Sequence, residues 1–198
     1  MANKPSFASL PIQKTGPRGN AWGLYGDNDE YGTLNKLTLG NIADAASREV
    51  RDGVRVSTDW PLNAISTPCF GRLAFQHDIK SKAPRPVNDD VLVLNTQSSS
   101  QWDDPPHYGY QKEKLFYNGK TQHEIETSAV NSIHAWVEAS GIVGHGVLLD
   151  YATWAEVQGI TLRPFESVSI PVSTLKEVAA AQGVEFRRGD SLLVRTGL

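Results

Sequence analysis

The sequence predicts an α/β protein. Two units in the second half of the chain each join a helical pattern to a continuous apolar run: residues 132–140 lead into 146–152, and residues 171–183 lead into 190–196. Continuous apolar runs are typical of strands buried on both faces, and helices alternating with such strands indicate an α/β fold. With 198 residues and 39% hydrophobic residues, the chain is long enough for one domain with a core.

The first half begins with a lead-in and a turn-rich loop. Residues 1–21 hold three prolines without apolar periodicity, so we expect an extended segment ahead of a single domain at 22–198. Residues 22–38 are dense in Gly, Asp and Asn, which favour tight turns. Thr38 is then placed to cap a helix that continues to Val50, with Asp52-Gly53 as its stop.

From Val54 onward the apolar period changes to two. Three runs rich in β-branched or aromatic residues predict strands, at 54–62, 70–79 and 91–97. The proline-bearing residues 80–90 between them are expected to form a polar loop that overhangs a site or touches a partner. In the later helices we expect Ser132 and Ser173 as N-caps and Gly141 and Gly183 as stops.

Composition excludes several functional classes. The net charge of −3 does not supply the clustered positive field of a nucleic-acid binder or a polybasic membrane-surface protein. Cys69 is the only cysteine, so no intramolecular disulfide and no thiolate metal cluster can form. No apolar run reaches the length of a signal h-region or a membrane span, and we therefore expect a cytoplasmic protein.

The segment QSSSQWDDPPH at 97–107 is the strongest candidate for chemistry. If the preceding strand continues, period two places Gln97, Ser99, Gln101 and Asp103 on one side, facing a cavity. The two prolines then turn His107 back toward this stripe. A carboxylate, two amides and an imidazole could hold a divalent cation and transfer a proton. The alternative is a hydrogen-bonded polar turn without catalytic function.

The same segment resembles the signature of the cyclase family, metal-dependent hydrolases that include bacterial-type kynurenine formamidase. In the motif H-x-G-T-H-x-D-x-P-x-H, the last three specified positions match Asp103, Pro105 and His107. Gln97 and Gln101 stand at the histidine positions, and Ser99 and Ser100 between them stand where Gly and Thr are specified. Further segments are similar to the longer fungal-type branch of the family, at 29–38, 115–119, 146–152 and 187–197.

The resemblance implies a swivelling β/β/α-type fold and hydrolysis of an amide, formamide or cyclic amide, such as an N-formylkynurenine-like substrate, by water bound to zinc or manganese. It assigns Asp103 to the metal and His107 to general acid/base catalysis, and it implies a homo-oligomer. At the ligand positions Gln97 and Gln101, amides in place of imidazoles disfavour dinuclear zinc and leave a single harder ion, or none.

The family's pattern continues beyond the strand at 190–196 with a further histidine and glutamate of the metal site. We therefore expect this chain to be the larger part of a longer enzyme. The competing hypothesis is an impaired homologue that only binds a small molecule or a partner.

Other candidates have simpler interpretations. His145 is expected at a strand entrance, His134 in solvent, and His77 and His123 in local ion pairs. Trp22 and Trp60 lie beside loops and could wall an aromatic-substrate pocket, whereas the strand parity of Trp102 predicts a core position.

Overall fold

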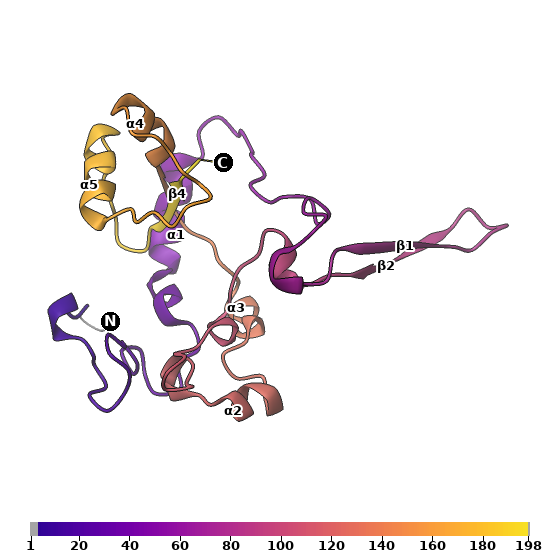
Figure 1. The fold of residues 1–198 in the computed structure, drawn as a ribbon, viewed down its shortest axis with the longest axis horizontal. Helices are drawn as coiled ribbons and strands as arrows, with labels where there is room; N and C mark the ends of the chain where they lie inside the picture. The colour runs from indigo at the N-terminus through magenta and orange to yellow at the C-terminus, as the bar shows by residue number, and fades with distance from the viewer. Residues whose placement is uncertain (1–3, 198) are drawn as a thin grey trace.

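The computed structural model describes residues 4–197 and shows a mixed α/β fold (Figure 1). It contains two sheets of two strands each, one antiparallel and one parallel. In chain order, the helices and strands are α1 Leu39–Glu49, β1 Gln76–Ser81, β2 Asn88–Val93, α2 Gln122–Thr127, α3 Ile133–Glu138, β3 Gly146–Asp150, α4 Tyr151–Val157, α5 Val172–Ala181 and β4 Ser191–Arg195. Residues 4–21 precede them as turns, with a single 3-10 turn at Phe7–Ser9.

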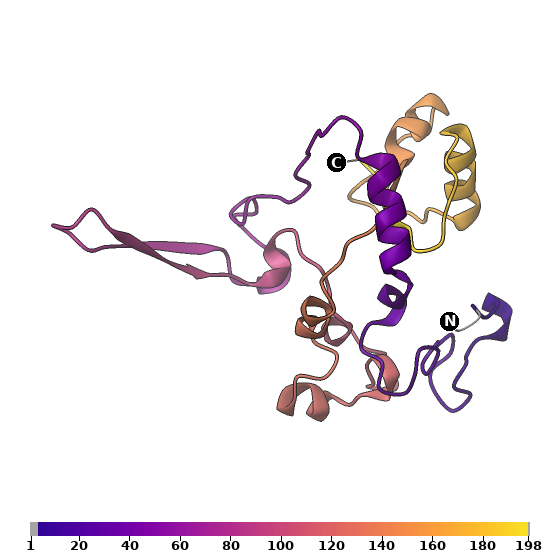
Figure 2. The same cartoon turned by 180° about the vertical axis from the view of Figure 1, so that it is seen from behind.

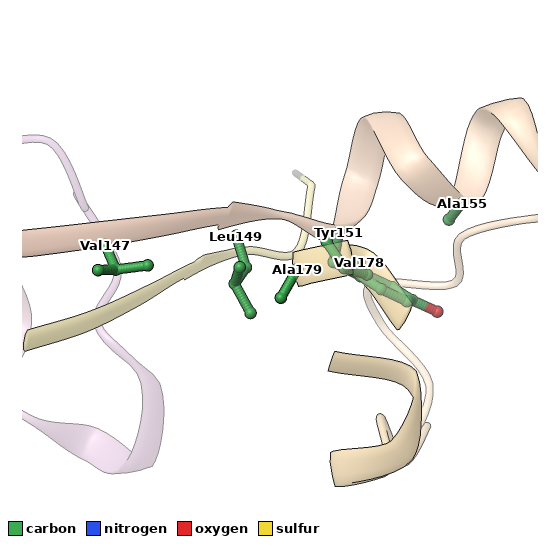
Figure 3. Close-up of a cluster of buried hydrophobic side chains, with 6 residues drawn as sticks. All are labelled: Val147, Leu149, Tyr151, Ala155, Val178 and Ala179. Carbon is green, nitrogen blue, oxygen red and sulfur yellow. The ribbon is translucent and has the colours of Figure 1, made fainter. Parts of the chain in front are cut away.

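The core lies between the parallel pair β3 and β4 and the helices α4 and α5. Figure 3 shows its buried side chains, which are Val147, Leu149, Tyr151, Ala155, Val178 and Ala179. Along β3, burial alternates: Leu149 is 1% exposed, whereas Leu148 is 55% exposed. The prediction of strands buried on both faces is therefore wrong for the described residues, because α4 and α5 pack against only one face of this sheet.

Strand β3 is also shorter than the apolar run predicted. Asp150 ends it by accepting a hydrogen bond from the backbone N–H of Thr153 at 3.0 Å, which caps helix α4. Tyr151 and Ala152, predicted as strand, are the first residues of that helix. A side-chain cap directly after a strand thus overrides the apolar pattern.

Helix α1 begins where the sequence predicts. Thr38 and Asn41 form a capping box, in which each side chain accepts a hydrogen bond from the other's backbone N–H. At the other end of α1, Glu49 lies 3.1 Å from Arg187 and 3.8 Å from His145, and His145 in turn bonds Asp190, just before β4, at 2.8 Å. His145 is a polar residue at a strand entrance, as predicted.

The other two predicted helices, α3 and α5, follow their predicted positions with different caps, whereas α2 and α4 were not predicted. Helix α3 starts after Ser132, but the Ser132 side chain forms no capping bond. Helix α5 starts at Val172 with Pro171 as its N-cap, so the prediction of Ser173 is wrong. Proline fits there because its fixed φ already has the extended value of a cap residue. Among residues 4–197, we find no helix with the length and apolar character that a membrane crossing requires.

The strand predictions for residues 54–97 need the largest correction. Residues 54–62 form no strand, although their pattern alternates, because no described strand pairs with them. Of the predicted loop at 80–90, residues 82–87 are a loop, whereas residues 80–81 and 88–90 belong to the strands of a hairpin, in which β1 pairs with β2 from Gln76↔Val93 to Ser81↔Asn88. Figures 1 and 2 show this hairpin as an arm that extends away from the other elements. We call residues 76–93 the hairpin arm.

Candidate functional site

The segment at 97–107 does not continue as a strand. Asn95 starts a 3-10 turn at Thr96–Ser98 because its side-chain oxygen accepts the backbone N–H of Gln97 at 2.9 Å. A second 3-10 turn covers Pro105–His107. The prediction of an extended strand with a period-two stripe is therefore wrong, because local side-chain hydrogen bonds fold this segment into turns.

Three of the predicted polar side chains nevertheless meet. Gln97 donates its Nε2 hydrogen bond to the carboxylate of Asp103, and Gln101 donates to Oε1 of Gln97 at 3.2 Å. Ser99 points elsewhere and donates to the carbonyl of Pro61 at 3.1 Å. The turn thus brings together Gln97, Gln101 and Asp103 and excludes the serine.

His107 lies apart from this group. Its backbone N–H closes the proline turn by donating to the carbonyl of Asp104 at 3.1 Å, and its side chain is exposed. The neighbouring Asp104 carboxylate accepts the backbone N–H of Ile133 at 3.0 Å. Asp104 therefore serves as the side-chain cap of helix α3 that Ser132 does not provide.

A cavity of about 520 Å³ opens beside Asp103. Its lining contains Asp103, Asp104 and Pro105, but not His107. Seven of its 15 lining residues are aromatic: Trp22, Tyr31, Tyr108, Tyr110, Phe116, Tyr117 and Trp136. The volume and the mixture of aromatic walls with a few polar groups are those of a small-molecule site.

Trp22 anchors this wall, as expected for a pocket residue. It is 5% exposed and packs edge to face on Tyr110, with ring centroids 5.6 Å apart. Trp60 is exposed and does not line the cavity. The prediction that Trp102 is a core residue is wrong: it is 65% exposed and lines a separate cavity of about 1190 Å³.

Two distant segments are clamped together behind the aromatic wall. The Tyr117 hydroxyl donates to Asp29 at 2.6 Å, and burial, together with this carboxylate, raises the pKa of Tyr117 well above its usual range. Asn118 accepts the N–H of Gly23 at 3.1 Å and donates to the carbonyls of Gly26 and Asp29 at 3.2 and 2.8 Å. Residues 23–29 and 117–118 therefore hold one another in place.

Comparison with known proteins shows which family the chain belongs to. A family model described as "Putative cyclase" matches residues 33–198. The chain belongs to the cyclase family. The assignment made from the sequence is thereby confirmed.

A solved structure described as that of a novel cyclase has 27% sequence identity to this chain and a TM-score of 0.76. The match covers 90% of this chain and 62% of the other, so the present chain spans less than two thirds of that cyclase's length. No curated protein matches.

The cyclase signature implies a metal, and the donor chemistry of Gln97, Gln101 and Asp103 can be compared with it. One carboxylate and two amide oxygens are hard ligands that suit manganese or magnesium. Zinc in catalytic sites prefers nitrogen or sulfur ligands, which this group lacks. Within residues 4–197, no three His, Cys, Asp or Glu side chains are grouped to hold an ion. By donor type the group suits a single hard ion rather than a dinuclear zinc centre, but in this structure its amides bond Asp103 and each other.

Two of the other histidines lie in local contacts outside the cyclase signature. His77 bonds Asp90 across the hairpin arm at 3.0 Å, as local pairing predicts, although through a different carboxylate from its sequence neighbour. His134 contacts Ser132. The sequence analysis did not predict the aromatic residues of the wall other than Trp22. A signal for them was present in the sequence: the Gly-rich segment 23–32 and the Asn-Gly segment 117–119, which hydrogen bonds join in the structure.

Proposed function

We propose that this cyclase-family protein binds and hydrolyses an aromatic amide, formamide or cyclic amide. The observation that carries the proposal is the aromatic cavity of about 520 Å³ with Asp103 of the family signature on its lining. Aromatic walls bind flat aromatic ligands through stacking and edge-to-face contacts. A ligand ring held there would place its polar substituent beside the Asp103 carboxylate.

In the reaction, water adds across the C–N bond and yields a carboxylic acid and an amine. Asp103, Gln97 and Gln101 are the residues that would hold a manganese ion at the cavity edge. The chemistry that such an ion supplies is Lewis-acid activation of water. The cyclase signature assigns to His107 the proton transfer to the leaving nitrogen, a role that an imidazole performs near neutral pH, although the His107 side chain does not line the cavity in this structure. Asp104 is committed to capping α3, so Asp103 is the carboxylate available for the ion.

The metal assignment is tested by thermal unfolding with and without Mn²⁺. An ion present at 100 times its Kd stabilises the folded state by about 2.7 kcal/mol, which raises the Tm of a chain of this size by roughly 5–10 °C. Asp103→Asn should abolish this rise. Asp104→Asn is the matched control, because it removes the same charge one residue away and asparagine still caps a helix. A flat response of the unsubstituted chain to Mn²⁺ would refute the metal role.

Hydrolysis is tested with an N-formyl arylamine, by following the absorbance of the released amine. Activity should depend on Mn²⁺ and be lost in Asp103→Asn and His107→Gln, while Asp104→Asn retains it. Activity that survives both substitutions would assign the chemistry to other residues.

A second candidate function is binding of an aromatic amide without turnover. It is favoured by the glutamines at the signature's histidine positions and by the lack of a three-ligand group in the described part of the chain. It predicts saturable quenching of the fluorescence of Trp22 and Trp136 by the same N-formyl arylamine, with no amine released at any Mn²⁺ concentration. Tyr108→Ala should weaken this binding because the Tyr108 ring lines the cavity.

A further inference from the structure

The larger cavity, of about 1190 Å³, carries mostly basic charges on its wall. Its charged lining residues are Lys4, Lys36, Arg187, Arg188 and Asp190. Four cations beside one anion contrast with the net charge of −3 of the whole chain. Cations that share a wall repel one another, and an anion held between them removes this cost. The charge distribution therefore favours an anionic ligand in this cavity.

The charges of Asp190 and Arg187 are already engaged by neighbouring groups. Asp190 bonds His145 at 2.8 Å and accepts the backbone N–H of Arg187 at 2.5 Å, and its side chain is only 7% exposed. The Arg187 guanidinium lies 3.1 Å from Glu49. Asp190 therefore does not neutralise the other cations of the wall.

The fold holds Lys36 and Arg188 beside one another. The side-chain amide of Asn41 donates to the backbone carbonyls of Lys36 and Arg188, at 2.7 and 3.4 Å. Between these segments, Gly189 has a φ of +88°, and a Cβ there would lie 2.9 Å from the carbonyl oxygen of Lys36, so the close approach requires glycine. Among residues 4–197, the side chains of Lys36 and Arg188 form no ion pair. Two cations without a carboxylate partner thus line the same cavity.

The rest of the lining suits an apolar ligand body. Trp102 and Leu192 line the cavity and are both more than half exposed. Tyr25 and Leu37, which are half-buried, also belong to the wall. Large apolar side chains beside two cations favour a ligand with an apolar ring and a negatively charged end.

We propose that this cavity is a second ligand site, which binds an aromatic carboxylate. The carboxylate pairs with Lys36 and with Arg188, whose planar guanidinium matches its two oxygens. The ring packs on Trp102. The site does not depend on the hydrolysis proposed at Asp103, because neither Asp103 nor Tyr108 lines this cavity.

Isothermal titration calorimetry with 2-naphthoate tests the charge requirement, and 2-naphthylmethanol is the neutral probe of similar shape. 2-Naphthoate should bind the 198-residue chain about tenfold more tightly than the alcohol, because only the carboxylate pairs with the cations. Raising the NaCl concentration from about 0.05 M to about 0.5 M should weaken the binding of 2-naphthoate only. Equal affinity of the two probes, or no binding of 2-naphthoate at about 1 mM, would overturn the proposal.

Substitutions in the cavity separate the roles of charge and ring. Lys36→Gln and Arg188→Gln should each weaken the binding of 2-naphthoate about fivefold and leave that of the alcohol unchanged. Both variants keep the local fold, because Asn41 bonds the backbone carbonyls and not these side chains. Trp102→Ala should weaken both probes by similar factors, since it removes ring contact without changing the charge. Unchanged binding of 2-naphthoate to both glutamine variants would refute the assignment of the two cations.

Two control variants locate the bound probe. Arg85→Gln removes the same charge as Arg188→Gln, but Arg85 lies in the loop of the hairpin arm, away from the cavity lining. Tyr108→Ala alters the aromatic cavity instead. Neither should change the affinity for 2-naphthoate. A loss in Arg85→Gln equal to that in Arg188→Gln would show nonspecific attraction to positive charge, and a loss confined to Tyr108→Ala would place the probe in the aromatic cavity; either result would overturn the second site.

Discussion

Substitution of Asn118 by alanine should loosen the contact between residues 23–29 and 117–118 behind the aromatic wall, which we call the clamp. The Asn118 side chain makes three hydrogen bonds to the backbone of residues 23–29, and its own backbone has a φ of +53°. Alanine loses all three bonds and must also adopt the left-handed conformation that asparagine and glycine tolerate better.

The cost can be worked out from these contacts. Each net hydrogen bond contributes about 0.5–1.5 kcal/mol, and the half-buried position lets water replace part of it, so the three bonds together give about 2 kcal/mol. The left-handed backbone adds about 1 kcal/mol for alanine. Asn118→Ala should therefore lower the free energy of unfolding by about 3 kcal/mol, whereas Asn118→Gly, which loses the bonds but keeps the backbone freedom, should lower it by about 2 kcal/mol.

Urea denaturation followed by tryptophan fluorescence measures both effects. A Cβ at the adjacent Gly119 would lie 3.6 Å from the Trp22 ring, so this tryptophan reports directly on the clamp. The N-formyl arylamine should also bind more weakly to both variants, since Tyr117 and Trp22 lose their fixed positions in the wall. If the free energy of unfolding of Asn118→Ala lies within about 0.5 kcal/mol of that of the unsubstituted chain, the Asn118 hydrogen bonds do not stabilise the fold. Equal stability of the alanine and glycine variants would refute the backbone contribution alone.

Two further predictions concern the core and the pH dependence of stability. Leu149→Ala should cost about 3 kcal/mol in urea denaturation because Leu149 is fully buried, whereas Leu148→Ala, on the open face of the same strand, should cost less than about 1 kcal/mol. The backbone N–H of Thr153, followed by the guanidinium of Arg195, holds the pKa of Asp150 below its usual value of 3.8. The stabilising charge is therefore present above this value and lost as the pH falls below it, so the stability difference between the unsubstituted chain and Asp150→Asn should shrink between pH 6 and pH 3.

The sequence predicts best those features that depend on neighbouring residues. Thr38 was predicted as a helix cap, and the residue that it bonds in the structure, Asn41, is only three positions away. Gly141 and Gly183 end their helices with φ values of +73° and +65°, as their positions after an apolar pattern indicate. In each case the bonds that decide the conformation lie within one turn of the chain.

Features that need a distant partner were predicted less well. Residues 54–62 alternate as a strand should, but a strand forms only where another strand offers its edge. The arm was predicted as two strands separated by a long loop, because the polar residues 80–90 gave no sign that they pair across the hairpin. The burial of β3 on one face likewise depends on where α4 and α5 pack, which periodicity does not reveal.

In the candidate site, too, features that depend on neighbouring residues were predicted and those that need a distant partner were not. The polar group at Gln97, Gln101 and Asp103 was predicted from one short segment, even though its backbone is turned rather than extended. The aromatic wall joins residues from Trp22 to Trp136, and its closure depends on the bond between Tyr117 and Asp29, 88 residues apart. A stripe on a single strand carries no information about such a bond.

Asp103 and Asp104 illustrate how the fold assigns chemistry to one of two adjacent carboxylates. From the sequence alone, either could be a ligand, and the family signature selects Asp103 by spacing. The structure adds a physical reason, since Ser132 leaves the N-terminus of α3 without its own side-chain cap and Asp104 supplies it. That bond ties the loop to α3, and Trp136 of the same helix contributes to the aromatic wall. Asp104 therefore positions the segment that presents Asp103 to the cavity, and replacing Asp104 by alanine should disturb ligand binding without removing a ligand of the ion.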